Sequence, residues 1–305
     1  MDKKIVVCGC TDFGYEIVDF LLTNDVNISH LVSLSPEQAI QHKVSGYKSF
    51  ELLSTKYGVP IYYPKLYSMK ETDFDFFEEE KFDLLLVCGW QRLIPNKILE
   101  TIKICGIGSH GSSELLPKGR GRSPVNWSII EGKKQFILQL FMLTSKIDDG
   151  DIVYHETFDI NEWDTCKTIY YKTSVVMKRA LLKLIPNILS SNFSRTPQSG
   201  EPSFYPKRTP DDGLIDWNKP LEEIHNFVKA LAKPYPGAFS FIDKQKIMIW
   251  EAQPFDRKIT FSDAKLGEIV EKFSTGDFVV KCNDGTLLII DYEGVVNKGE
   301  FLSKL

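Results

Sequence analysis

The chain has 305 residues, of which 43% are hydrophobic and 26% charged, a composition typical of a globular protein with about two domains. Its net charge of −4, with no dense Lys/Arg run beyond residues 118–122, disfavours a nucleic-acid partner gripped through many phosphates. No stretch approaches the roughly 18 apolar residues of a membrane span, and the N-terminal apolar run is too short and interrupted for a signal peptide. We therefore expect a cytoplasmic protein without a membrane span.

Apolar runs and helical spacings alternate along the first hundred residues. This alternation predicts a doubly wound parallel sheet, the Rossmann type of α/β fold. The first turn lacks the glycine fingerprint of dinucleotide-binding proteins, since only Gly9 and Gly14 punctuate it, so nothing indicates NAD. The expected strands are 4–10, 28–34, 59–63 and 82–88, and the expected helices are 13–22, 49–57 and 95–101.

The middle of the chain predicts one more strand, over 136–143, and a long helix over 164–189. Residues 190–210 are rich in Ser, Pro, Asn and Gly, which is typical of an interdomain linker. We therefore expect a catalytic domain over 1–189, a linker over 190–210 and a second domain over 211–305.

The second domain is predicted to be a small antiparallel β-barrel preceded by a helix over 221–231. Asp284-Gly285 between two apolar runs is a strong hairpin signal. The expected strands are 238–242, 246–252, 267–273, 277–282 and 286–292. An apolar strand such as 246–252 could form the face of a homodimer.

His110 is the first candidate for chemistry. It ends an apolar stretch and runs into a Gly- and Arg-rich loop, where it could act as a base beside a polar or anionic substrate. Asp148, in the Asp-Asp-Gly-Asp segment 148–151, lies beyond a single strand-like run. A base and a carboxylate on either side of one strand indicate an acyl-transfer site. The six scattered cysteines lie mostly in apolar stretches, so we expect packing roles and no metal site.

Several further motifs accompany His110 in a fixed order: Leu-Leu-Pro at 115–117, Arg-Gly-Arg-Ser-Pro at 120–124, Trp127 and 148–152, with support from 89–95, 206–212, 215–217 and 234–240. Taken together, these motifs resemble the 10-formyltetrahydrofolate-dependent formyltransferases over most of the chain. The resemblance implies a Rossmann-like catalytic domain, a C-terminal OB-like barrel and 10-formyltetrahydrofolate as the formyl donor.

Within that family, residues 120–127 are similar to the branch that acts on sugar nucleotides, and so are 43–47 and 56–60. The resemblance therefore implies a nucleotide-linked amino sugar as the formyl acceptor, and a formamido sugar of the kind used in lipopolysaccharide O-antigen as the product. It implies substrate contacts by Ser112, Arg120, Arg122, Pro124 and Trp127. It implies a folate pocket lined by Cys88, Trp90, Arg92, Leu93, Ile147 and Asp149.

The chemistry of amide formation explains the two catalytic candidates. The attacking amine must lose a proton, and histidine is the usual base near neutral pH. Asp148 would orient the His110 ring and raise its basicity, or hold the water network around N10 of the folate. Two features depart from the family pattern Asn-x-His-x-Ser-Leu-Leu-Pro: Gly108 stands where the family has asparagine, and two extra residues lie between His110 and Leu-Leu-Pro at 115–117. The donor for the developing oxyanion would then be a backbone N–H, the protonated His110, or one of the serines 109, 112 and 113.

Two other functions stay open at this point. A methionyl-tRNA formyltransferase should present a basic face and bind in a strongly salt-dependent way. A catalytically impaired protein that binds folate or a nucleotide is the second alternative, and Gly108 is the residue that motivates it.

Overall fold

The computed structural model describes residues 3–70 and 72–303, and they form two compact units. The first unit comprises Met1–Gly121, Ile137–Phe158 and Tyr170–Phe204. The second comprises Arg122–Phe136, Asp159–Ile169 and Tyr205–Leu305. The division is discontinuous in sequence, and the predicted boundaries at 189 and 211 stay a prediction.

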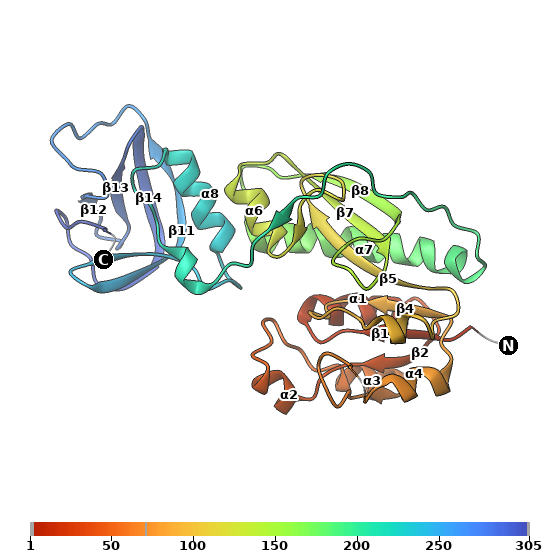
Figure 1. Cartoon of the computed structure of the whole chain (residues 1–305). Helices are drawn as coiled ribbons and strands as arrows, with labels where there is room; N and C mark the ends of the chain where they lie inside the picture. The colour runs from red at the N-terminus through yellow and green to blue at the C-terminus, as the bar shows by residue number, and fades with distance from the viewer. Residues whose placement is uncertain (1–2, 71, 304–305) are drawn as a thin grey trace. The chain divides into compact units, whose positions relative to one another are not determined.

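The first unit is built on a seven-stranded sheet in the order β3-β2-β1-β4-β5-β7-β8, of which Figure 1 labels every strand except β3. β1 pairs in parallel with β2 and β4, and β5 pairs in parallel with β4, whereas β7 runs antiparallel to β5. This core confirms the predicted Rossmann-like class. The strands are β1 (Ile5–Cys8), β2 (Ile28–Val32), β3 (Ile61–Tyr62), β4 (Leu84–Val87), β5 (Cys105–Ser112), β7 (Gln135–Met142) and β8 (Ile152–Asp159).

Helices cover both faces of this sheet, which explains why its inner strands are continuous apolar runs. In β1, Ile5 and Val7 belong to one buried cluster, and Val6 and Cys8 to the other. The first cluster includes side chains of α1 (Asp12–Thr23), α3 (Glu51–Tyr57) and α7 (Cys166–Leu189), and the second includes side chains of α4 (Phe74–Glu80) and α5 (Asn96–Leu99). The short helix α2 spans Pro36–Gln41.

The second unit contains a five-stranded antiparallel sheet in the order β10-β11-β14-β13-β12. The last described residues close it into a barrel, because Ser303 bridges to Phe241 of β10 and Phe301 bridges to Glu268, next to β12. The elements are α6 (Pro124–Ile130), the 3₁₀ helix Pro210–Gly213, α8 (Leu221–Leu231), β10 (Ala238–Ile242), β11 (Gln245–Asp256), β12 (Ile269–Lys272), β13 (Phe278–Cys282) and β14 (Gly285–Glu293).

Every helix and strand predicted above is present, with ends displaced by a few residues. The sequence did not reveal α2, α4, α6, β5 or β8. β5 has the sequence Cys-Gly-Ile-Gly-Ser-His-Gly-Ser, and its glycines weaken any strand signal. α6 begins directly after Ser123, whose φ of 58° is unusual for a residue with a side chain.

The segment predicted as a linker has fixed contacts in the first unit. Thr196 forms a bridge with Ile152, and the backbone of Ser203 bonds to Pro117 and Arg120. Two short strands pair beyond β5, namely β6 (Arg120–Gly121) and β9 (Phe204–Tyr205). Whatever the domain boundary, residues 196–203 lie against the sheet and its loops.

His225 on α8 makes the second unit sensitive to pH. Burial, and then the charge of Lys229, lower the pKa of this imidazole to about 4, and among the described residues its buried Nδ1 atom has no hydrogen-bond partner. The unfolded chain therefore takes up this proton at a higher pH than the folded chain. The contribution of the neutral His225 to the stability of the folded chain is therefore complete above about pH 6.5. It is lost as the pH falls toward 4.

We expect the melting temperature of the chain to fall between pH 7 and pH 5, and to fall less in His225→Phe, which has no proton to gain. Thermal melts followed by circular dichroism at the two pH values measure this. His155→Gln, at an exposed position of β8, is the control and should melt like the parent. An identical pH response in His225→Phe would contradict the assignment.

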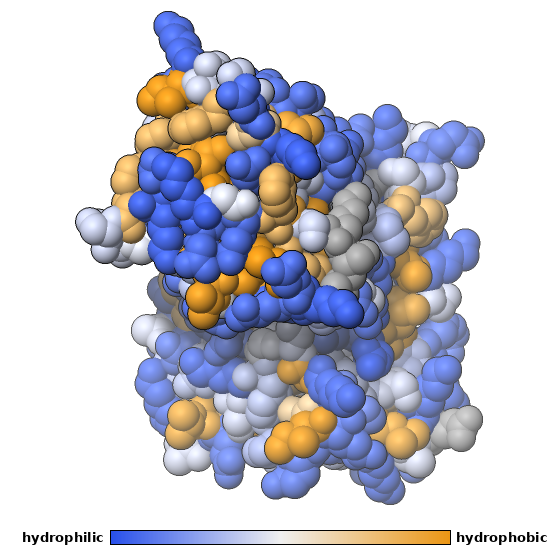
Figure 2. Space-filling model, turned by 90° about the vertical axis from the view of Figure 1, so that its left-hand side faces the viewer, coloured by the Kyte–Doolittle hydropathy of each residue, from blue (hydrophilic) through white to orange (hydrophobic). Residues whose placement is uncertain are grey.

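The face drawn in Figure 2 carries hydrophobic patches separated by hydrophilic side chains. On the second unit, exposed apolar side chains include Phe255, Phe273 and Val295. The homodimer stays a prediction. Over the described residues, no helix is both long enough and apolar enough to cross a bilayer.

Candidate active site

His110 lies at the carboxyl edge of the parallel strands, where α/β enzymes place their sites. β5 pairs with β4 only as far as Ile107, and beyond that point only β7 continues alongside it, with Gln139 opposite His110. The His110 side chain is 6% exposed. The strand therefore carries His110 past the end of β4 and holds it in a nearly buried position.

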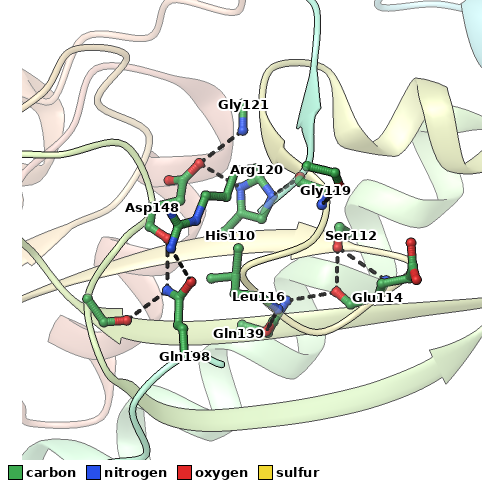
Figure 3. A network of polar contacts seen from close by, with 12 residues as sticks. His110, Ser112, Glu114, Leu116, Gly119, Arg120, Gly121, Gln139, Asp148 and Gln198 are labelled. Carbon is green, nitrogen blue, oxygen red and sulfur yellow. Dashed lines mark hydrogen bonds and ion pairs between the residues drawn. The ribbon is translucent and has the colours of Figure 1, made fainter. Parts of the chain in front are cut away.

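Both ring nitrogens of His110 face acceptors (Figure 3). Nε2 lies 2.7 Å from the carbonyl oxygen of Gly119, and Nδ1 lies 3.5 Å from Oδ2 of Asp148. A carbonyl only accepts, so Nε2 carries the hydrogen and the neutral ring has its lone pair on Nδ1. A proton taken up at Nδ1 would sit beside the Asp148 carboxylate, which would stabilise the resulting positive charge.

Asp148 sits in a tight turn between β7 and β8 that folds back over β5. Its φ is 48°, and its Oδ2 atom accepts a hydrogen bond from the Gly121 N–H at 3.2 Å. A side chain at position 150 would collide with the backbone, because an ideal Cβ on Gly150 lies 1.7 Å from the Met142 carbonyl oxygen. The structure thus brings together the two residues predicted to be catalytic, while their roles stay a prediction.

The loop after β5 is held by polar side chains of β5 and β7. Ser112, predicted to contact substrate, is fully buried, and its hydroxyl bonds to the backbone of Glu114. Gln139 accepts from Leu116 N–H and donates to the Glu114 carbonyl. Arg120, also predicted to contact substrate, is buried and pairs with Asp149 at 2.8 Å. In this structure both side chains are engaged within the site, and a substrate contact by either would require a change of partner.

The residues predicted to line a folate pocket fall into two loops. Residues 88–93 follow the carboxyl end of β4, and residues 147–149 belong to the turn over β5. Burial raises the pKa of the Cys88 thiol to about 12, so it is not a nucleophile. Arg92 stacks over the Tyr67 ring at 4.5 Å, and the Asp149 carboxylate is paired with Arg120.

Three of these residues fit the requirements of a flat ligand with polar edges. The Trp90 ring packs edge-on against Tyr67, and among the described residues its buried Nε1 has no hydrogen-bond partner. Leu93 and Ile147 are 52% and 47% exposed. A free indole donor and uncovered apolar side chains are what a pterin ring could satisfy, so the residues fit a folate.

The last predicted substrate contacts stand at the start of α6, in the second unit. Arg122 is exposed and Pro124 begins the helix. Trp127 stacks on Tyr205 at a centroid distance of 5.7 Å, with the Arg208 guanidinium 5.0 Å from its ring. Arg122 is thus the exposed cation of this motif. Over the described residues, no cluster of His, Cys, Asp and Glu could hold a metal ion.

Gly108 leaves room that a neighbouring side chain occupies. An ideal Cβ at this position would lie 2.7 Å from Cδ2 of Leu143, which follows β7 and packs over β5. An asparagine here would overlap the Leu143 side chain unless Leu143 moved. The absence of an asparagine side chain at position 108 and the position of Leu143 are therefore linked, because Leu143 occupies the space that the asparagine would need.

We expect Gly108→Asn to lower the free energy of unfolding by about 1–3 kcal/mol, the usual cost of overpacking. Combining it with Leu143→Ala should be less damaging than the two single changes added together, because the second change opens the space. Urea denaturation of the four proteins measures this. Strict additivity would show that Leu143 is not the obstacle.

The parallel sheet, the buried His–Asp pair at its carboxyl edge and the separate barrel define a Rossmann-like transferase with an accessory β-domain. Family models agree with this class: the "Formyl transferase" model matches residues 3–185, and "Formyl transferase, C-terminal domain" matches 207–294. The chain belongs to the formyl transferase family.

Individual relatives point the same way. The chain is 31% identical over 289 residues to the bifunctional polymyxin resistance protein ArnA of Wigglesworthia glossinidia brevipalpis, a match that covers 94% of this chain and 42% of ArnA. It thus spans less than half of that relative.

Two solved structures share the fold. The N-formyltransferase from Helicobacter canadensis, solved with folinic acid and dTDP-3-aminofucose, has a TM-score of 0.69 and 16% identity over 96% of this chain and all of that one (100%). The sugar 3N-formyltransferase WlaRD, solved with dTDP and 5-N-formyl-THF, has a TM-score of 0.70 and 18% identity over 96% and 99% of the two chains.

Proposed function

We propose that this protein transfers a formyl group from 10-formyltetrahydrofolate to the amino group of a nucleotide-linked amino sugar. The observation that carries the proposal is the His110–Asp148 pair at the carboxyl edge of a formyltransferase sheet. The folate would supply the activated formyl group, and the protein would supply the base, the orientation and the exclusion of water.

We assign the following tasks to the two catalytic side chains. Nδ1 of His110 accepts the proton that the amine loses, since Nε2 already donates to Gly119. The carboxylate of Asp148, 3.5 Å away, stabilises the ring once it is charged. Acyl transfer also needs a donor for developing negative charge, and Gly108 offers no side chain for it. We propose that His110, once protonated at Nδ1, is that donor.

Trp90, Leu93 and Ile147 would hold the folate. Cys88, Arg92 and Asp149 would contribute through their backbone, because Cys88 is buried and the charged groups of Arg92 and Asp149 already have partners. For the sugar nucleotide, Arg122 is the best-placed cation of its motif, because its side chain is exposed. A guanidinium matches diphosphate oxygens well.

The choice of a sugar nucleotide rests on three supports. The net charge of −4 is unfavourable for binding tRNA through its phosphates. Residues 120–127 resemble the sugar-nucleotide branch. Two structures with the same fold are described as sugar N-formyltransferases or were solved with dTDP-3-aminofucose. A cytoplasmic location and a role in lipopolysaccharide O-antigen synthesis remain predictions that accompany this proposal.

A substrate panel tests the proposal. The protein is incubated with 10-formyltetrahydrofolate and dTDP-, UDP- and GDP-linked amino sugars, and mass spectrometry follows the gain of one formyl group. We expect turnover on at least one sugar nucleotide. Turnover only on charged initiator tRNA would establish the methionyl-tRNA reaction instead, and folate binding without turnover on any acceptor would establish a binding protein.

A further inference from the structure

The segment that follows α7 braces both partners of His110. Within residues 196–203, the Gln198 side chain bonds to the turn that carries Asp148, and Ser203 bonds to the loop that carries Gly119 (Figure 3 draws the Gln198 side). We infer that Gln198 and Ser203 are positioning residues for the His110–Asp148 pair. The inference rests on the proposed function, because the pair is catalytic only if that proposal holds.

Gln198 uses its whole amide on the Asp148 turn. Its Nε2 donates to the carbonyl oxygens of Asp148 and Gly150, at 2.8 Å each. Its Oε1 accepts from the Arg120 guanidinium at 2.6 Å, and Arg120 in turn pairs with Asp149. One side chain thus binds two carbonyl groups of the turn, those of Asp148 and Gly150.

The turn that carries Asp148 needs contacts with other segments to hold its conformation. Asp148 has a φ of 48°, in the left-handed region that costs a residue with a side chain on the order of 1 kcal/mol or more. Such a conformation persists only where the surroundings fix it. The carboxylate must also stay within reach of Nδ1, which is 3.5 Å away. Gln198 fixes the backbone from which that carboxylate projects.

Ser203 performs the matching task on the other side of the ring. Its Oγ accepts from the Gly119 N–H at 2.9 Å, and its carbonyl accepts from the Arg120 N–H at 3.0 Å. The Arg120 N–H and the Gly119 carbonyl belong to one peptide group, and that carbonyl receives the Nε2 hydrogen of His110. Ser203 therefore holds the peptide that sets the tautomer and tilt of the ring.

Gln198 and Ser203, from one segment, thus hold the groups that face the two nitrogens of His110. Gln198 holds the turn of Asp148, beside Nδ1, and Ser203 holds the peptide of Gly119, beside Nε2. A displacement of about 1 Å in such a site can cost about 100-fold in rate. Loss of either brace should lower kcat and leave substrate binding largely intact, since neither side chain belongs to the proposed folate or sugar contacts.

Paired variants in the full chain test this. Gln198→Ala and Gln198→Glu should each lower kcat by about 10- to 100-fold, with KM for both substrates within about twofold. The glutamate keeps an acceptor for Arg120 but cannot donate to the two carbonyls. Ser203→Ala should lower kcat by about 10-fold, whereas Ser203→Thr should restore it, because Ser203 is exposed and threonine keeps the Oγ atom. Gln135→Ala and Ser190→Ala, both at exposed positions, are the matched controls and should behave like the parent.

A readout without turnover separates this inference from the proposed function. Nitrogen-15 NMR of the histidine side chains, with His110 assigned from a His110→Gln spectrum, should show hydrogen on Nε2 in the parent chain. The His110 signals should shift or broaden in Gln198→Ala and Ser203→Ala. If the parent transfers no formyl group, the proposed function fails. These spectra still test whether Gln198 and Ser203 position the His110 ring. Unchanged His110 signals together with parental kcat in both alanine variants would overturn the inference.

Discussion

Replacing His110 by alanine is expected to lower kcat for formyl transfer by about 1,000-fold and to leave folate affinity within a few-fold of the parent. Proton transfer by a positioned side chain contributes about 10²–10⁴-fold to such reactions. In this chain, the donor for the oxyanion is assigned to the same ring, because Gly108 has no side chain to share that task. The loss should therefore lie above the lower end of that range. Steady-state kinetics and fluorescence titration with folinic acid measure the two quantities.

His155→Ala is the matched control, because His155 is an exposed histidine on β8 of the same sheet and should tolerate the change. Folding of His110→Ala is checked by its melting temperature. If His110→Ala kept more than about a tenth of the parental kcat, the base would have to be another group and the assignment of Nδ1 would fail.

The motifs predicted the two central residues of this site and the strand that lies between them in sequence. His110 and Asp148 stand in local patterns, and the apolar run over 136–143 predicts a strand on elementary grounds. That these two side chains meet does not follow from their patterns. It depends on β7 running antiparallel to β5 and on the next turn folding back over β5, with Gly150 pressed against the Met142 carbonyl.

The supporting residues were not predictable in the same way. Residues 190–210 have the composition of a linker, and nothing local distinguishes Gln198 or Ser203 from the other polar residues there. Their function comes from hydrogen bonds to carbonyl and amide groups about 50 to 85 residues away in sequence. The glycines of β5 are a second example. In the sequence they indicate a break in a strand, whereas in the structure Leu143 fills the space beside Gly106 and Gly108. A contact that exists only in the tertiary structure leaves no periodic signal.

Asp148→Asn is expected to lower kcat by about 100-fold while KM and stability change little. Asparagine has nearly the same size, tolerates a φ of 48° and can still accept the hydrogen bond from the Gly121 N–H. What it removes is the negative charge beside Nδ1 of His110, so the protonated ring loses its stabilising partner as the amine gives up its proton. Steady-state kinetics and urea denaturation measure both sides of this expectation.

Two further variants separate the charge from the backbone. Asp148→Gly accepts the left-handed conformation without strain, so its kcat should fall as far as that of Asp148→Asn although no amide is present. Asp25→Asn is the matched control, because Asp25 is exposed and has a φ of 58°, and it should keep parental kcat. If Asp148→Asn kept parental kcat while Asp148→Gly did not, Asp148 would act through its hydrogen bond to Gly121 alone. The chemistry would then depend on the shape of the turn, and His110 would need no charged partner.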